Sequence, residues 1–477
     1  MPPQAWQEAF PLLVRHLGSS NYVVHTYCSI AIDRILHLTD ANSNPVIART
    51  AVAPLSQDIL KQLFKLITKD TAPEKVQENE FLMRCVMRVL IVLREDLVPQ
   101  TDFLLQQLIA ITNVIRHNPS NPRFYYFLFE TIGALIHFAA PSQPEKLETA
   151  LYSPFANILS EDVQEFMPYV LQLFAALLEA NPSSTLSDYY KSLIGPVITP
   201  TLWESRGNTP ALVRLLSSLI MRGAPDIAAA DQLTPVLVIF QRLIAYKSSE
   251  TYAFDLLESI INAFPIATLQ PFLVEIFRLL LARLSGSKTE NFSLRFTRLY
   301  HFMASRTDEG LGTDAVISTF DQLQDGVFAQ IYPAIILPDT QKLTRPLDRK
   351  TAVIALTKTI ADSAIFAEKF AKGWSRTCEA LLKIMVNPPV IAAHADEHAG
   401  GLPEQDVDDL SFGVGFTQLN TCRKVQMDPF SEVVDLKAWI SAYLKQADVR
   451  HGGRVSSFLQ QRLDEGLRVA LLGYMQS

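Results

Sequence analysis

The sequence predicts an all-α protein built as a superhelical solenoid, in which antiparallel helix pairs stack on their neighbours. Three observations support this fold class. Apolar residues make up 48% of the 477 residues and only 18 residues are glycine, a composition that favours helices over turn-rich β-sandwiches. Apolar stripes with helical spacing follow one another along the chain. Finally, the same kind of helix start returns at a nearly constant interval.

The segment 206–225, "RGNTPALVRLLSSLIMRGAP", shows the predicted unit. Asn208 suits a helix N-cap, and Pro210 suits the first turn. We expect Gly223 to end the helix in a left-handed conformation and Pro225 to prevent it from resuming. Between these signals, one buried face is predicted for Leu212, Leu215, Leu216, Leu219 and Ile220.

Similar starts recur along the chain, and from Asn79 onward they are about 40 residues apart, the period of HEAT or armadillo repeats. The predicted starts are Asn21, Asn79, Asn121, Ser160, Asn208, Ser249 and Asn291. A second helix is predicted between successive starts, at 55–68, 100–115, 145–159, 186–203 and 268–284. Prolines at 168, 196 and 200 are expected to bend their helices. The sequence therefore predicts a HEAT-repeat solenoid.

The regularity of the repeats divides the chain into two parts. Regular repeats are predicted for 1–305, with an elongated first repeat that carries loops at 38–55 and 69–78. Less regular repeats and a cap are predicted for 306–477, which also contains an acidic loop at 394–410. The helices expected there are 313–325, 340–362, 366–386, 431–446 and 452–473.

Charge and cysteine content exclude several classes of protein. The net charge is −7 and no cluster of lysine and arginine is present, which argues against a nucleic-acid partner. Charged residues interrupt the most apolar runs well before about 18 residues, so no membrane insertion is expected. Four cysteines lie far apart without a CxxC pair, which favours a reducing, intracellular environment.

The sequence contains no convincing site for chemistry. Neither a nucleotide-binding motif nor a GxSxG elbow is present. A metal site could form from His394 and His398 beside Asp396 and Glu397 if that segment were helical. However, the glycines that follow favour a solvated acidic loop. We therefore predict no enzyme, no catalytic or metal-binding residue and no cofactor.

Arginines on the second helices of the repeats are the first candidate partner-binding residues. They are Arg84, Arg88, Arg214 and Arg222. Two interpretations stay open for them, because these helices form either a solvated face or the surface on which HEAT arrays bind partners.

Two further groups of polar residues are candidates for partner contact. Glu204, Arg206 and Asn208 gather with Trp203 in the elbow "WESRGN", where they serve either packing between repeats or a partner. In the acidic loop, carboxylates form either a solubilising linker or a group that steers a basic partner. The residues chosen there are Asp406, Asp408 and Asp409.

Several stretches resemble the importin-α re-exporters, a family of the importin-β (karyopherin) superfamily. They are "YVVHTYCSIAIDRIL", "NEFLMRCVMRVL", "NPSNPRFYYFLFETI", "EDVQEFMPYVLQLFAALLE" and "TLWESRGNTPALVRLLSSLIMRG". The resemblance runs along nearly the whole chain and is most specific at 79–223. Members of the family are about twice as long, so the chain resembles their C-terminal half. Met1 is accordingly expected to be an introduced start.

The resemblance implies a nuclear export receptor that recycles importin-α from nucleus to cytoplasm together with Ran-GTP. The implied partners are the importin-α cargo, Ran-GTP and nuclear pore proteins, with the main Ran site on N-terminal repeats that this chain lacks. The receptor would shuttle through the nuclear pore without catalysis of its own. Periodicity alone fits a HEAT-repeat scaffold subunit of another assembly equally well.

Overall fold

The computed structural model describes residues 3–204, 206–387, 418–424 and 427–476. The described chain is helical, and its β-type pairing is limited to an isolated bridge between Thr39 and Pro45. It forms two compact units, Met1–Gly223 with Glu397–Val425, and Ala224–Asp396 with Gln426–Ser477. We call them unit 1 and unit 2. Among the described helices, none combines the length and apolar character needed to cross a bilayer.

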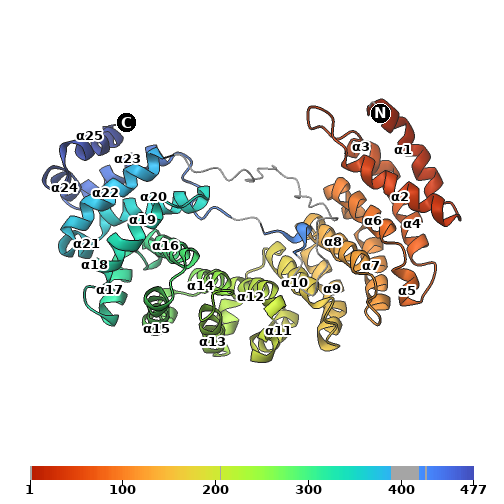
Figure 1. The fold of residues 1–477 in the computed structure, drawn as a ribbon, viewed down its shortest axis with the longest axis horizontal. Coiled ribbons are helices and arrows are strands. Elements are labelled where there is room, and N and C mark those ends of the chain that lie inside the picture. Colours follow the sequence, from red (N-terminus) through yellow and green to blue (C-terminus); the bar gives the residue numbers. More distant parts are fainter. Residues whose placement is uncertain (1–2, 205, 388–417, 425–426, 477) are drawn as a thin grey trace. The chain divides into compact units, whose positions relative to one another are not determined.

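Unit 1 consists of helix pairs in two layers (Figure 1). The first layer contains α1 (Pro3–Leu17), α4 (Ser56–Ile67), α7 (Thr101–Ile115), α9 (Pro144–Ser160) and α11 (Asp188–Ile198). The second layer contains α2 (Tyr22–His37), α6 (Glu80–Leu93), α8 (Pro122–Ala139), α10 (Met167–Ala180) and the start of α12 (Thr209–Ala229). Within the second layer, α2 packs on α6, α6 on α8 and α8 on α10, while α4, α7 and α9 cover the other side. The stacked helix pairs confirm the predicted HEAT-like solenoid fold.

Short helices occupy the connections in unit 1. The two segments predicted as loops of an elongated first repeat contain α3 (Arg49–Val52), η1 (Ala53–Leu55) and α5 (Pro73–Val76). Further along are η2 (Arg94–Gln100), η3 (Pro200–Trp203), η4 (Arg206–Asn208) and η8 (Asn420–Cys422). The boundary predicted near residue 305 separates regular from less regular repeats, whereas units 1 and 2 are compact units of the fold. The predicted boundary therefore stays a prediction.

Two of the predicted asparagine caps are confirmed in full. The side-chain oxygen of Asn21 accepts hydrogen bonds from the N–H groups of Val23 and Val24, at 3.0 and 3.4 Å. At α8, Asn121 does the same for the N–H groups of Arg123 and Phe124, both at 3.2 Å. These bonds satisfy donors that a helix start would otherwise leave free.

Three other predicted starts differ in detail or are wrong. Asn79 precedes α6, but it makes no side-chain cap bond, and its amide instead donates to Thr26 Oγ1 at 2.6 Å. Ser160 is the last residue of α9, and α10 begins only at Met167. At α16 the cap is Thr289, and Asn291 lies inside the first turn.

Helix α12 confirms the predicted apolar stripe but corrects its end. All five stripe residues are completely buried. Gly223 is not left-handed, because its φ is −119° and its ψ is 24°, and α12 continues after this break to Ala229. Pro225 therefore lies in the first turn of the resumed segment, where proline is tolerated. Glycine at 223 lets the side chain of Leu186 approach closely, since a Cβ atom there would lie 2.2 Å from Leu186 Cδ1 and would displace it.

The prolines have less effect on helix geometry than predicted. Pro168 lies in the first turn of α10 and Pro200 opens η3, so neither bends an α-helix. Of these three prolines, Pro196 alone lies inside an α-helix, α11, which ends at Ile198 rather than at the predicted 203. The predicted second helices at 55–68, 100–115, 145–159 and 268–284 are all present to within two residues.

Unit 2 continues the pairing of helices with more interruptions. Its first four complete helices are α13 (Leu233–Ile244), α14 (Glu250–Ala263), α15 (Ile266–Gly286) and α16 (Glu290–Ala304). Then follow η5 (Thr307–Glu309), α17 (Thr313–Leu323), α18 (Val327–Ile331), the π-helix η6 (Tyr332–Ile336), α19 (Leu337–Thr340) and α20 (Pro346–Asp362). The end is formed by α21 (Ala364–Lys369), α22 (Ala371–Val386), α23 (Leu436–Arg450), α24 (Arg454–Arg462) and α25 (Glu465–Gln476).

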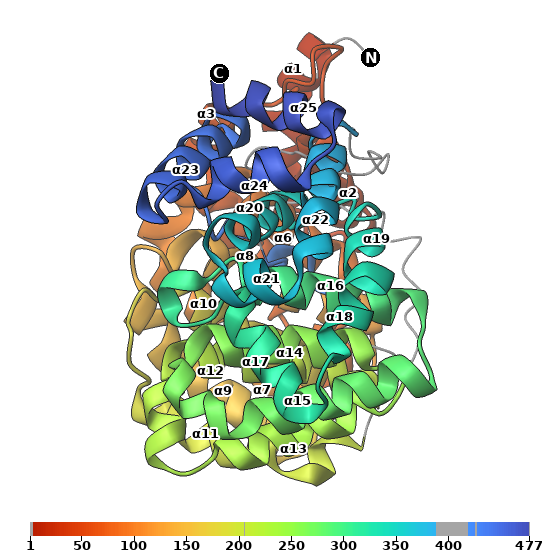
Figure 2. The same ribbon diagram turned by 90° about the vertical axis from the view of Figure 1, so that its left-hand side faces the viewer.

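Several predicted helices of this unit are divided or shorter. The helix predicted at 366–386 forms as α21 and α22, and the one at 452–473 forms as α24 and α25. The helices predicted from 340 and 431 begin at Pro346 and Leu436. The two C-terminal helices, α24 and α25, pack on α22 and α23 (Figure 2). Unit 2 thus ends in two short helices that each contact both α22 and α23.

Candidate partner-binding residues

Arg84 and Arg88 on α6 share one carboxylate of α2. Their Nε atoms lie 3.0 Å from the two oxygens of Asp33, whose side chain is 4% exposed. Burial lowers the pKa of Arg88, although the charge of Asp33 opposes that shift. The solvated face considered for these arginines is therefore wrong for Arg88, which is a buried link between neighbouring helix pairs.

Arg214 on α12 makes a similar link to α10. Its Nη2 and Nε atoms donate to the two oxygens of Glu179 at 2.8 and 3.3 Å. Ser218 Oγ donates to the same carboxylate at 2.9 Å. Burial opposes the charged form of Arg214, but the charge and hydrogen bonds of Glu179 outweigh it and raise the pKa of Arg214.

Arg222, two turns further along α12, reaches α9. Its Nη1 donates to Glu148 at 2.7 Å, and its Nε donates to the backbone carbonyl of Thr185 at 2.9 Å. Asn181 Nδ2 donates to the same Glu148 oxygen at 3.0 Å. Both charged side chains are 7% exposed. All four candidate arginines thus bind carboxylates of a neighbouring helix pair, an arrangement that holds adjacent repeats in register.

The elbow divides into a buried and an exposed part. Trp203 is 4% exposed, and its Nε1 donates to the carbonyl of Val197 at 2.8 Å. Asn208 is 5% exposed and directly precedes α12. Glu204, by contrast, is exposed. The packing role considered for the elbow suits Trp203 and Asn208, whereas Glu204 faces solvent.

Some candidates cannot be placed. Arg206 belongs to η4, but its side chain lies outside the described part of the structure. The acidic loop at 394–410 lies outside the described residues, with Asp406, Asp408, Asp409 and both histidines of the possible metal site. In the described chain, no three His, Cys, Asp or Glu side chains are grouped to hold a metal ion.

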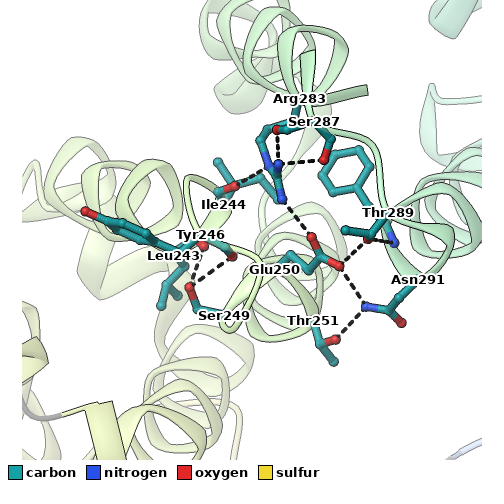
Figure 3. Close-up of polar contacts among 11 residues, drawn as sticks. Leu243, Ile244, Tyr246, Ser249, Glu250, Thr251, Arg283, Ser287, Thr289 and Asn291 are labelled. Atoms are coloured by element: carbon teal, nitrogen blue, oxygen red, sulfur yellow. Dashed lines mark hydrogen bonds and ion pairs between the residues drawn. The ribbon is translucent and has the colours of Figure 1, made fainter. Parts of the chain in front are cut away.

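A buried polar cluster in unit 2 repeats the principle of the arginine links (Figure 3). Glu250, the first residue of α14, is 2% exposed. Its Oε2 accepts from Arg283 Nη2 at 2.8 Å, and its Oε1 accepts from Thr289 Oγ1 at 2.6 Å and Asn291 Nδ2 at 3.2 Å. Arg283 also donates to the carbonyls of Ile244 and Ser287. One carboxylate therefore joins α14 to the end of α15 and the start of α16.

Residues 418–424, which we call the strap, make a further kind of contact that no sequence pattern predicts. The strap contains η8 and packs on α8 and α10 of unit 1 (Figure 1). Glu130 on α8 is 1% exposed and accepts from the backbone N–H groups of Asn420 and Thr421, at 2.6 and 2.9 Å. Hydroxyl groups of Thr421 and Tyr126 donate to it as well, at 2.6 and 2.7 Å.

The seat for the strap has two further parts. Gln172 Oε1 on α10 accepts from the N–H of Leu419 at 2.9 Å. Gly133 lies one turn after Glu130 and leaves room for the strap, since a Cβ atom there would lie 2.2 Å from Thr421 Oγ1 and 2.8 Å from Cys422 Sγ. Burial raises the pKa of Glu130, and the hydrogen bonds from the strap offset only part of that rise.

A sequence signal for the seat exists but is weak. A carboxylate and a glycine, Glu130 and Gly133, interrupt the apolar helix "FYYFLFETIGALI" without a turn nearby. Buried carboxylates need donors, and a glycine inside a helix weakens it unless another segment approaches closely. Nothing in the pattern shows which segment supplies the donors.

Comparison with known proteins gives a consistent set of relatives. The family model described as "CAS/CSE protein, C-terminus" matches residues 33–474. An importin-alpha re-exporter of Schizosaccharomyces pombe is 38% identical over 465 residues, which cover 96% of this chain and 48% of the relative. The importin alpha re-exporter of Saccharomyces cerevisiae is 34% identical over 447 residues, which cover 92% of this chain and 45% of the relative.

A solved structure agrees with these relatives. "The exportin Cse1 in its cargo-free, cytoplasmic state" matches with a TM-score of 0.83 and 31% identity, over 100% of this chain and 47% of that one. The chain thus spans about half the length of the relatives it matches.

Proposed function

Because the chain belongs to the CAS/CSE family, we propose that it is the C-terminal half of a nuclear export receptor that returns importin-α to the cytoplasm together with Ran-GTP. The observation that carries this proposal is the match of the whole solenoid, in sequence and in fold, to one half of an exportin. These similarities favour an export receptor over a HEAT scaffold of another assembly.

The proposed mechanism is binding without catalysis. The family is one of transport receptors, and we infer that this chain carries out no reaction. Its contribution is a solenoid surface for the importin-α cargo, with secondary contacts to Ran-GTP and nuclear pore proteins during shuttling between nucleus and cytoplasm. The main Ran site belongs to the N-terminal half of the receptor in this proposal.

The links between repeats support a division of labour among the candidate residues. Arg84, Arg88, Arg214 and Arg222 set the spacing of the helices that present a binding surface, because their charges are spent on carboxylates of the protein itself. The exposed Glu204, with Arg206, is the part of the elbow that we propose for direct partner contact.

Binding of importin-α tests the proposed function. The chain and a full-length relative would be immobilised and their affinities for importin-α measured with and without Ran-GTP. We expect the chain to bind importin-α more weakly than the full receptor and to gain less from Ran-GTP. No binding by a chain with native helix content, under conditions in which the full receptor binds, would contradict the proposal.

The elbow is tested by charge reversal. We expect Glu204→Lys to weaken importin-α binding without changing thermal unfolding. The matched control is Glu145→Lys, which alters an exposed glutamate in the first turn of α9, on the first layer. Equal affinities for the two variants would show that the elbow makes no specific contact.

The acidic loop is proposed to steer association with a basic partner surface. Replacing Asp406, Asp408 and Asp409 by asparagine should slow association at low ionic strength and leave melting unchanged, because long-range attraction is screened by salt. On-rates equal to those of the unchanged chain at every salt concentration would favour a simple linker.

A further inference from the structure

The strap fixes two basic residues on the second layer of unit 1. Leu419, Asn420 and Thr421 give their backbone N–H groups to Gln172 and Glu130, so the backbone path up to η8 is determined by α8 and α10. Arg423 and Lys424 follow directly, and both are exposed. The strap shows no helical or strand pattern in the sequence. Its backbone is nevertheless fixed by α8 and α10 directly before Arg423 and Lys424.

The two positive charges are only weakly compensated. Lys424 Nζ lies 3.9 Å from Glu179 Oε1, but that carboxylate already receives Arg214 and Ser218 at shorter distances. Among the described residues, the side chain of Arg423 makes no ion pair and no hydrogen bond. At a distance near 4 Å, an exposed ion pair gains little, so Lys424 remains available.

Two described carboxylates lie against the strap: Glu130 is buried, whereas Glu179 is exposed and bound by Arg214. Glu130 is 1% exposed, and its oxygens face the strap backbone and two hydroxyl groups. Asp33, Glu148 and Glu179 are each bound by arginine. The carboxylates that the strap contacts are thus already bound within unit 1, while the strap adds two exposed cations.

We propose that the strap is a built docking element, which presents Arg423 and Lys424 to an acidic segment of importin-α. This inference rests on the proposed function and adds a place and a charge to it. Charge complementarity decides the chemistry of the occupant: a cationic pair beside internally paired carboxylates attracts an acidic segment and disfavours a basic one. Anchoring of the backbone through Glu130 and Gln172 lowers the backbone entropy that a free loop carrying the same two side chains would lose on binding.

Charge reversal of the pair is the direct test. The double variant Arg423→Glu/Lys424→Glu would be compared with the unchanged chain for importin-α affinity across a salt series. We expect at least a tenfold loss at low ionic strength, with a smaller loss at high salt, because the interaction is screened. The matched control, Lys61→Glu/Lys65→Glu, reverses two exposed cations of α4 on the first layer and should change affinity far less.

A second pair of variants tests the role of the seat. Gly133→Ala places a Cβ atom against Thr421 and should release the strap, seen as faster hydrogen exchange at 418–424 with α8 and α10 still protected. In the Gly133→Ala background, reversing the charges of Arg423 and Lys424 should reduce importin-α affinity by less than half as much as in the unchanged chain. An equal loss of affinity in both backgrounds would show that the seat is not needed to present the two basic residues.

The outcomes separate this inference from the proposed function. If the unchanged chain binds importin-α and the strap reversal equals the control, the strap inference is wrong and the proposed function stands. If the unchanged, folded chain does not bind importin-α, both the proposed function and this partner are rejected.

Discussion

Glu130 of unit 1 and Glu250 of unit 2 are two buried carboxylates whose burial is compensated by different partners. Their residues are 1% and 2% exposed. Glu250 is compensated by the guanidinium of Arg283, with a hydroxyl and an amide beside it. Glu130 is held by two backbone N–H groups and two hydroxyls, and no cation of the described part of the chain binds it.

The difference shows what each carboxylate is built to hold. Glu250 joins consecutive helices of one region, where a permanent ion pair fixes a junction between repeats. Glu130 holds a segment 290 residues away in the sequence through donors of its backbone. Neutral donors leave part of the burial penalty uncompensated, which is why the pKa of Glu130 is raised. The ion-paired carboxylate is thus a structural joint, and the neutral one is a receptor for another segment.

Removing Glu250 should have the largest effect. Glu250→Ala leaves the mostly buried Arg283 without its carboxylate, and we expect unfolding to become easier by about 3–5 kcal/mol. Denaturant unfolding measures this loss. In the double variant Glu250→Met/Arg283→Met, the loss should be smaller than the sum of the two single losses. A loss below about 1 kcal/mol for Glu250→Ala would show that the pair is not needed for the junction.

Glu130→Gln should have a smaller and more local effect. Glutamine keeps one oxygen but replaces the other by a donor, which faces the donors of the strap and leaves one or more of them unsatisfied. We expect a cost of about 1–3 kcal/mol, seen first as faster hydrogen exchange of residues 419–421. Unchanged exchange in the strap with slower or equal unfolding would contradict the receptor interpretation.

The space at Gly133 sharpens the same comparison. Gly133→Ala should cost about 1 kcal/mol or more, because the strap has to shift by the overlap with Thr421. Gly473→Ala in α25 is the control, since a Cβ atom there meets nothing within 4 Å. The control should be neutral or slightly stabilising, since alanine is the better helix former. Similar melting shifts for both variants would exclude a steric role for Gly133.

The pH dependence of the strap is the smallest expected effect. The folded pKa of Glu130 is raised, so the folded state holds a proton over a pH range in which the unfolded state has lost it. Stability from this group is then greatest below the unfolded pKa and falls as pH rises from there to the folded pKa. Acidification should therefore raise the unfolding free energy of the unchanged chain relative to that of Glu130→Gln. A difference independent of pH would contradict the raised pKa.

The sequence could predict the fold because the stripe and the period are local signals. Leu212, Leu215 and Leu216 mark a buried face within one helix, and Asn21 and Asn121 cap within three residues.

The predictions for Gly223 and Ser160 are wrong because local rules do not include the contact with Leu186 or the turn that precedes α10. The arginines were found, but their carboxylate partners lie 35 to 74 residues away, so a solvated face could not be told from a link. Thr421 gave no signal, because its partner is nearly 300 residues away.

The order in which the chain is made gives the strap a particular history. The larger part of unit 1 ends at Gly223, yet Asn420, which fills the seat on α8, is made 290 residues after Glu130. At a synthesis rate of about 5–20 residues per second, Glu130 waits roughly 15–60 s for its donors. Until then water must solvate its carboxylate, beside a helix surface shaped for a segment not yet made. The seat on α8 can therefore be filled only after the helices from α9 to α22 have been made.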